Sequence, residues 1–418
     1  LRIRFGSRLR IARFLAGLWL ALRFRRGGLG NPPAPAGKRP AAEMEIGPLA
    51  EGALSRRRFR AVAAAVDRAE ILGWLRETDP ARLEDLFRRA DAARRKAVGD
   101  EVHLRGLLEI SNHCVRACAY CGIRAPRKGL SRYRMSAGEI LEGAIRAAAL
   151  GFGTVVLQAG EDPDLARNFV ADAVRAVKRE TDLAVTLSLG ERDEGDLQAW
   201  REAGADRYLL RFETSDAALY GRLHPGRGGA PGSPEDRMAI LRTLKSLGYE
   251  AGSGVLLGLP GQTWESLAGD LEVFRDLDLD MIGVGPYVPD PATPLWREAA
   301  ARPPEGPGAD PETDAFKMVA LSRLACPESN IPATTALATV GGEAARLSAL
   351  ARGANVVMPN LTPPRYRRLY RIYPGKFAPD LSDDALLAGL QRSVESMGRR
   401  IGRGPGGRVG DRATSSLP

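Results

Sequence analysis

Residues 111–134 read SNHCVRACAYCGIRAPRKGLSRYR, and they hold three of the four cysteines in this chain of 418 residues. Cys114, Cys118 and Cys121 have the spacing C-x3-C-x2-C, and Tyr120 stands directly before the last cysteine. A loop with three thiolates can bind three corners of a four-iron cluster, whereas a cluster held entirely by protein uses four cysteines. The spacing therefore predicts one 4Fe-4S cluster whose remaining iron is open to another ligand.

A structural zinc site is the alternative for the same loop. His113 could supply the fourth ligand, because three cysteines and one histidine form a common zinc set. The side chains of the adjacent residues His113 and Cys114 would then have to turn onto one ion, whereas structural zinc ligands usually come in separated pairs. On this interpretation the chain is a zinc-stabilised scaffold and not an enzyme.

The overall composition is that of a globular protein, with 44% hydrophobic and 27% charged residues. The formal net charge is +10, and residues 1–43 account for nine of these charges because they carry ten Lys and Arg residues against one glutamate. The rest of the chain is close to neutral, so we expect no basic groove for nucleic acid. A membrane- or nucleic-acid-associated protein that acts through its basic tail remains an alternative.

Residues 1–43 form a basic tail that differs from the rest of the chain. Its apolar patch, residues 14–24, is shorter than the roughly 20 residues that cross a bilayer, so we expect no transmembrane segment. The patch could lie on a membrane surface, form part of a signal peptide, or be translated upstream sequence ahead of Met44. The Gly/Pro/Ala-rich linker that follows predicts disorder. An iron–sulfur enzyme needs reducing surroundings, so we expect a cytoplasmic protein.

Strand and helix patterns alternate along most of the chain. Helical patterns over 54–71 and 79–96 come first, and eight short apolar runs follow, separated mostly by helical segments. The expected strands are 102–110, 154–160, 184–190, 207–214, 250–258, 281–287, 331–336 and 355–360.

Such an alternation predicts parallel strands with right-handed crossovers, and eight units predict a closed (β/α)8 barrel of the TIM type. We expect N-terminal helices over 44–100, the barrel over 101–376, a C-terminal helix over 377–402 and a disordered tail over 403–418. A six-unit partial barrel with a separate C-terminal domain is the alternative. In a closed barrel the active site lies at the carboxyl ends of the strands.

Polar side chains stand at several of these strand ends. Residues two apart face the same side of a strand, so Thr186 pairs with Ser188 and Arg211 pairs with Glu213. The hydroxyl pair could simply fill the barrel interior. Charges inside a strand are costly to bury without partners, so Arg211 and Glu213 form either a structural ion pair or a ligand site. A separate helix is expected after Ser233, because Pro234 is of the residue type that is favoured at the first position of a helix.

The cysteine loop, with a strand before it, resembles the C-x3-C-x-aromatic-C signature of the radical S-adenosylmethionine (SAM) superfamily. The segments CAYCGIR, VVLQAGEDP, RYLLRFET, LGLPGQT and YRRLYRIYPGK are further similar to the HydE family of FeFe-hydrogenase maturases. This resemblance implies a radical SAM barrel and an enzyme that generates a 5′-deoxyadenosyl radical from SAM during assembly of the hydrogenase diiron centre. A mutase or synthase acting on an amino acid, like methylornithine synthase or biotin synthase, is the alternative.

The resemblance also implies roles for individual residues. The cluster would be held by Cys114, Cys118 and Cys121; SAM would be contacted by Tyr120, Gln158, Gly160, Thr186, Ser188, Glu213 and Arg237; and the substrate would meet Arg211, Thr334, Thr335, Asn360 and Tyr366. Tyr366 could equally belong to an aromatic ridge with Tyr370 and Tyr373.

The resemblance implies partners as well. These are an organometallic or amino-acid-derived substrate, the maturases HydG and HydF, and an electron donor such as ferredoxin or flavodoxin. Some members of the family hold a second cluster with further cysteines near the end of the barrel. This chain has only Cys326 beyond the triad, in an apolar segment typical of a buried position, so we expect a single cluster.

Overall fold

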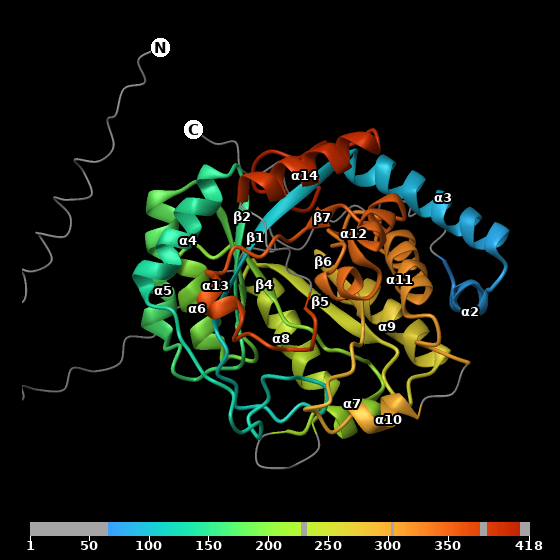
Figure 1. Cartoon of the computed structure of the whole chain (residues 1–418), viewed down its shortest axis with the longest axis horizontal. Coiled ribbons are helices and arrows are strands. Elements are labelled where there is room, and N and C mark those ends of the chain that lie inside the picture. The colour runs from blue at the N-terminus through green and yellow to red at the C-terminus, as the bar shows by residue number, and fades with distance from the viewer. Residues whose placement is uncertain (1–65, 227–231, 302–304, 377–382, 410–418) are drawn as a thin grey trace, which may run out of the picture. The chain divides into compact units, whose positions relative to one another are not determined.

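The computed structural model describes residues 66–226, 232–301, 305–376 and 383–409. A parallel sheet lies at its centre, with helices packed around it (Figure 1). The strands follow the order β6-β5-β4-β3-β2-β1-β7, and β8 also pairs with β1. Their bounds are β1 Glu101–Ser111, β2 Thr154–Ala159, β3 Ala184–Ser188, β4 Arg207–Leu209, β5 Glu250–Leu257, β6 Met281–Pro286, β7 Val356–Val357 and β8 Arg400–Ile401.

Residues 330–333 close the barrel between β6 and β7. Met281 forms a parallel bridge with Asn330, and Pro332 forms one with Val356. The backbone N–H of Ile282 also donates to the carbonyl oxygen of Asn330 at 3.0 Å. The predicted (β/α)8 barrel is therefore confirmed. The strand expected over 331–336 is reduced to these bridges, because Thr334 already caps a helix through its hydroxyl.

Helices connect most successive strands and cover the outside of the barrel. The bounds are α2 Arg68–Arg76, α3 Pro80–Val98, α4 Ala137–Ala149, α5 Arg167–Glu180, α6 Glu194–Glu202, α7 Ala217–Leu223, α8 Pro234–Ser246, α9 Trp264–Asp276, α10 Trp296–Ala300, α11 Pro311–Ala325, α12 Thr335–Ala351, α13 Pro364–Arg367 and α14 Asp383–Ser396. α12 is kinked at Gly342, whose φ of 69° is not helical. The expectations for residues 1–43 and 54–65 lie outside the described residues.

The expectation of a disordered tail from residue 403 does not hold for the first part of that segment. The carbonyl oxygen of Pro405 accepts hydrogen bonds from the Thr154 hydroxyl at 2.9 Å and from Arg207 at 3.1 Å. Arg408 forms ion pairs with Asp278 at 2.7 Å and Asp280 at 3.0 Å. This segment packs against residues at the amino-terminal ends of the strands, so it forms part of the floor of the barrel. Residues 410–418 lie outside the described part.

Apolar side chains fill the space between the sheet and its helices. Val155, Val185 and Ile282 on the strands, with Leu244 and Leu271 on the helices, have no more than 1% of their surface exposed. Their burial stabilises the barrel by roughly 1.5–3 kcal/mol for each large side chain. None of the described helices is both long and apolar enough to cross a membrane.

Candidate active site

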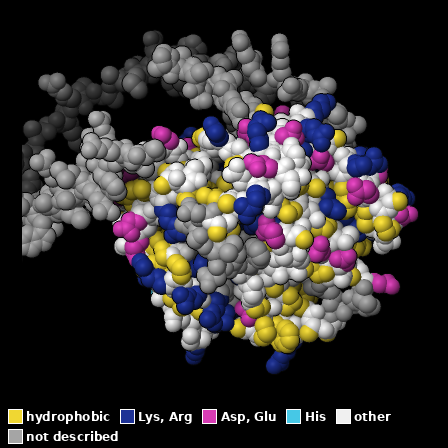
Figure 2. All heavy atoms as spheres, turned by 45° about the horizontal axis from the view of Figure 1, so that its top comes forward, with side chains coloured by type: hydrophobic (Ala, Val, Ile, Leu, Met, Phe, Trp, Pro, Cys, Tyr) yellow, Lys and Arg dark blue, Asp and Glu magenta, His cyan; other side chains and the backbone are white. Residues whose placement is uncertain are grey.

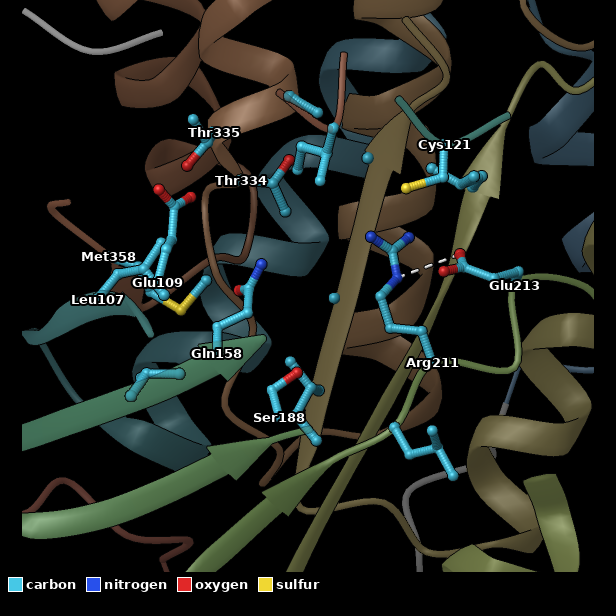
Figure 3. Close-up of a pocket in the computed structure, with 18 of the residues that line it drawn as sticks. Leu107, Glu109, Cys121, Gln158, Ser188, Arg211, Glu213, Thr334, Thr335 and Met358 are labelled. Carbon is cyan, nitrogen blue, oxygen red and sulfur yellow. Dashed lines mark ion pairs between the residues drawn. The ribbon is translucent and has the colours of Figure 1, made fainter. Parts of the chain in front are cut away.

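A cavity of about 340 Å³ lies inside the barrel and reaches the carboxyl ends of the strands, where active sites of such barrels lie. Fourteen of the fifteen predicted site residues line it, and Tyr366 is the exception. In Figure 3, Cys121 and Glu213 lie on one side of the view and Glu109, Thr334 and Thr335 on the other. The cavity therefore brings the cysteine loop and the expected substrate end together.

Backbone hydrogen bonds fix the cysteine loop to three different parts of the barrel. The N–H of Val115 donates to the carbonyl oxygen of Glu161 at 2.9 Å, that of Ala119 to Leu223 at 2.8 Å, and that of Gly122 to Ile372 at 2.8 Å. The backbone N–H of Arg116 lies 3.4 Å from the sulfur of Cys114. Such a donor favours the thiolate, which is the form that binds iron.

Gly160 makes the close packing of this loop possible. A Cβ atom at this position would lie 2.1 Å from the carbonyl oxygen of His113 and 2.8 Å from the Cβ of Cys114. Both distances are below the contact distance of about 3.5 Å for nonbonded carbon atoms. Only glycine allows the end of β2 to approach the loop this closely.

The donor set fits an iron–sulfur cluster better than a zinc ion. All three cysteines line the cavity and His113 does not, so the proposed fourth zinc ligand is misplaced. Within the described ranges, no three His, Cys, Asp or Glu side chains converge on a point where one metal ion could bind. A four-iron cluster needs no such convergence, because each cysteine binds a different iron. Burial raises the pKa of Cys118 to about 12 when no metal is bound.

Arg211 and Glu213 meet as predicted, but not on a strand. β4 ends at Leu209, and Glu213 takes the unusual φ of 66° while bridging to Val255. Arg211 Nε lies 3.2 Å from Glu213 Oε2, and the dashed line in Figure 3 marks this ion pair. Burial raises the pKa of Glu213, and the positive charges of Arg211 and Arg237 oppose this. A strained residue with a buried charge is typical of a functional position.

Arg237 lines the cavity at the centre of an ionic network that the sequence did not reveal. Its Nε lies 2.9 Å from Glu191 Oε1, and its Nη2 lies 2.6 Å from Nε2 of the buried His224. Glu191 also pairs with Arg116, whose Nε lies 2.9 Å from Glu161. Arg116 stands between two of the cysteines, so this network joins the cysteine loop to α8.

Polar groups also gather at the opposite end of the cavity. Thr334 and Thr335 begin α12, and Asn360 follows β7. Glu109 on β1 forms a buried ion pair with Lys376, and neither residue was predicted as part of the site. Glu109 could have been found from the sequence, because it places a charge inside the apolar run of the first strand, where an unpaired charge is costly to bury.

Gln158, Thr186 and Ser188 line the wall between the two ends of the cavity. The side-chain amide of Gln158 donates to the Tyr370 hydroxyl at 3.2 Å, so part of its polar group is already engaged. The Thr186 hydroxyl is buried and has no hydrogen-bond partner among the residues that the structure describes. An unpartnered buried hydroxyl is costly, so this one is suited to a bound ligand.

The structure places Tyr366 outside the cavity, so its predicted role as a lining residue is wrong. Its ring stacks on Tyr133 with 4.6 Å between centroids, and its hydroxyl donates to Glu139 at 2.7 Å. This hydrogen bond lowers the pKa of Glu139 to about 2, together with bonds from Ser136 and Arg365. α13 turns Tyr366 toward α4, and Tyr370 and Tyr373 line the cavity instead.

Comparisons with known proteins agree with this geometry. Residues 108–274 match the model of the radical SAM superfamily. The chain is 47% identical over 327 residues to the FeFe hydrogenase maturase subunit HydE of Thermotoga maritima, covering 78% of this chain and 89% of that protein. The chain belongs to the HydE family. Members of the radical SAM superfamily are enzymes that use a 4Fe-4S cluster and SAM.

Other relatives of this HydE family member share its barrel. It is 32% identical over 278 residues to 3-methylornithine synthase of Methanosarcina acetivorans, covering 66% of this chain and 74% of that protein. A crystal structure of methylornithine synthase superposes with a TM-score of 0.69 at 26% identity, covering 82% and 95% of the two chains. The structure of HydG from Carboxydothermus hydrogenoformans gives 0.64 at 18% identity, covering 80% and 75%, which shows a shared fold alone.

Proposed function

We propose that this enzyme carries out a radical SAM reaction in the assembly of the diiron centre of FeFe-hydrogenase. The observation that supports this most strongly is the 47% identity to a HydE protein over 89% of its length, combined with three cysteines that line one cavity. The substrate would be a small organometallic precursor. HydG and HydF would be the partner maturases, and the setting would be cytoplasmic because the cluster requires reducing conditions.

Cys114, Cys118 and Cys121 would hold one cluster. When bound, the cluster and SAM supply a 5′-deoxyadenosyl radical, and the protein must orient SAM and the substrate and exclude water. A single cluster is supported by Cys326, which is 9% exposed at the end of α11 and far along the chain from the triad.

The chain's own residues divide the cavity into a SAM end and a substrate end. At the SAM end, Glu213 would accept hydrogen bonds from SAM, and Arg237 would supply positive charge. The remaining SAM contacts would come from Tyr120, Gln158, Gly160, Thr186 and Ser188. Arg211 points into the cavity between the two ends, so its guanidinium would meet an anionic group of SAM or the substrate.

At the substrate end, Thr334, Thr335 and Asn360 would donate hydrogen bonds. The apolar lining, including Leu107, Val156, Leu256, Ile282 and Met358, would keep water away from reactive species.

An amino-acid substrate is the second candidate. It is favoured by the 32% identity to 3-methylornithine synthase and by the close superposition with methylornithine synthase. Both candidates share the cluster and SAM, so the substrate distinguishes them.

The test is anaerobic reconstitution followed by incubation with SAM, dithionite and each candidate substrate. Hydrogenase maturation predicts that 5′-deoxyadenosine or an adenosyl adduct accumulates with the organometallic precursor and not with amino acids. The opposite pattern would establish the amino-acid alternative. Failure of every candidate to promote SAM cleavage would contradict both.

A further inference from the structure

Two basic segments lie beside the cysteine loop. Residues 122–134 contain five Lys and Arg residues and no Asp or Glu, and residues 361–376 have the same composition of charges. Residues 399–409 also carry four arginines and no Asp or Glu, but they pack at the floor of the barrel. Figure 2 shows basic and acidic side chains interspersed over most of the face it presents. The two segments beside the cysteine loop therefore concentrate basic charge near the three cysteines.

These segments, far apart in the sequence, contact each other directly. The backbone N–H of Gly122 donates to the carbonyl oxygen of Ile372 at 2.8 Å. The Asn112 side chain donates to the carbonyl oxygens of Ser131 and Leu369, both at 2.9 Å. They therefore form one continuous surface, which we name the basic collar. Lys376, the tenth cation of the two segments, pairs with Glu109 in the cavity and is not counted with this surface. The cations of the basic collar are Arg124, Arg127, Lys128, Arg132, Arg134, Arg365, Arg367, Arg368 and Arg371.

Carboxylates pair with only part of the basic collar. Arg127, Arg134 and Arg365 form ion pairs with aspartate or glutamate side chains. Among the described residues, no ion pair joins the other six cations to a carboxylate. Arg124 and Arg132 donate instead to backbone carbonyls of the cysteine loop, at 2.8 and 2.7 Å. The collar therefore keeps a surplus of positive charge.

The cysteine loop comes close to the surface beside the collar. Cys114 and Cys121 are only partly buried, and 48% of the Val115 side chain is exposed, which is unusual for a large apolar residue. A redox group bound to these cysteines would lie near this surface, while the rest of the cavity extends into the barrel.

We propose that the basic collar docks a small acidic protein that carries a one-electron redox group and reduces the cluster. This inference rests on the function proposed above, because only a protein that uses the cluster needs such a donor. The donor loses one electron and the cluster gains it, so no bond forms and no proton moves. Electron-transfer complexes have small interfaces, below roughly 1,200 Å², and complementary charge guides their encounter.

The test uses a charge-reversal variant that leaves the loop and cavity intact. Lys128, Arg368 and Arg371 are exposed, and none of them lines the cavity. The variant carries Lys128→Glu, Arg368→Glu and Arg371→Glu. A matched control carries the same change of charge on exposed residues of other helices: Lys96→Glu, Arg242→Glu and Arg392→Glu.

Two readouts are compared for the reconstituted full-length proteins, with a purified acidic flavodoxin as the donor. One is the dissociation constant for the donor, measured before any turnover, and the other is the second-order rate of cluster bleaching by the reduced donor. We expect the collar variant to lose at least about tenfold in both at low salt, because steering of this kind changes on-rates by 10–10³. The loss should shrink at high salt, where the Debye length falls to about 3 Å.

The outcomes separate this inference from the function on which it rests. Reduced methyl viologen, a small cation, should bleach the clusters of all three proteins at similar rates. If it does so while the collar variant reacts with the donor as fast as the control, the docking proposal is overturned. Collar-dependent binding of an oligonucleotide, without binding of the donor, would assign the surface to nucleic acid instead. Absence of a reducible cluster in the parent protein would defeat the proposed function itself.

Discussion

Replacing Gly160 with alanine adds a methyl group at the point where β2 meets the cysteine loop. The new Cβ would lie 2.1 Å from the carbonyl oxygen of His113, so the strand end or the loop must move by more than about 1 Å. Overpacking of this kind costs about 1–3 kcal/mol, and we expect the upper end of the range because the clashing atom belongs to the backbone. The displaced loop also carries Cys114, so cluster binding should weaken.

The assay measures iron per chain after reconstitution and the free energy of unfolding of the protein without iron. Gly153→Ala is the matched control, because its Cβ would also meet a backbone oxygen, that of Gly404, but at the floor of the barrel. We expect both variants to be destabilised, and only Gly160→Ala to lose iron. Gly73→Ala in α2 meets nothing within 4 Å and should be neutral or slightly stabilising. Full iron content and unchanged stability in Gly160→Ala would refute the packing argument.

Three further predictions concern cluster binding, the floor of the barrel and the free energy of unfolding at acidic pH. Cys118→Ser should abolish stable cluster binding, whereas Cys326→Ser should retain about four irons per chain. About eight irons per chain in the parent protein would contradict a single cluster. Arg408→Ala should lower the free energy of unfolding by about 1–2 kcal/mol, because it removes the charged hydrogen bonds to Asp278 and Asp280 while both carboxylates keep Lys245 as a partner. The exposed Arg403→Ala should change it by less than about 0.5 kcal/mol. Both are measured by urea denaturation, and equal effects of the two substitutions would contradict the role of Arg408. Because the pKa of Glu139 is lowered to about 2 in the folded protein, its carboxylate stabilises the fold above pH 4.5, and this contribution disappears as the pH falls toward 2. The difference in the free energy of unfolding between Glu139→Gln and the parent should therefore shrink over that interval. A constant difference would show that the carboxylate is not stabilising.

The regular alternation of strands and helices was enough to predict the barrel, because each apolar run between helical segments can only be buried in a parallel sheet. Two details could not be predicted. Residues 331–336 have the composition of a strand, but the hydroxyl of Thr334 caps α12 and ends the extended backbone there. The glycine-rich segment after Gly402 has no periodicity. It is held in place because buried arginines of the barrel donate hydrogen bonds to its backbone carbonyl oxygens.

Most of the candidate site followed from local signals. The cysteine triad was recognisable by its spacing, and Arg211 and Glu213 by their charge at a strand end. Lys376 and Glu191 carry no local signal, because their partners lie far away in the sequence. Tyr366 was misassigned because a periodic run of tyrosines does not reveal which ring faces the cavity.

We expect Cys114, Cys118 and Cys121 to hold a cluster whose open iron binds SAM inside this barrel. The electron paramagnetic resonance spectrum of the anaerobically reduced protein, recorded with and without SAM, tests this arrangement. We predict the signal of one 4Fe-4S cluster that changes when SAM is added. A signal that SAM leaves unchanged, or one that persists when all three cysteines are replaced by alanine, would contradict it.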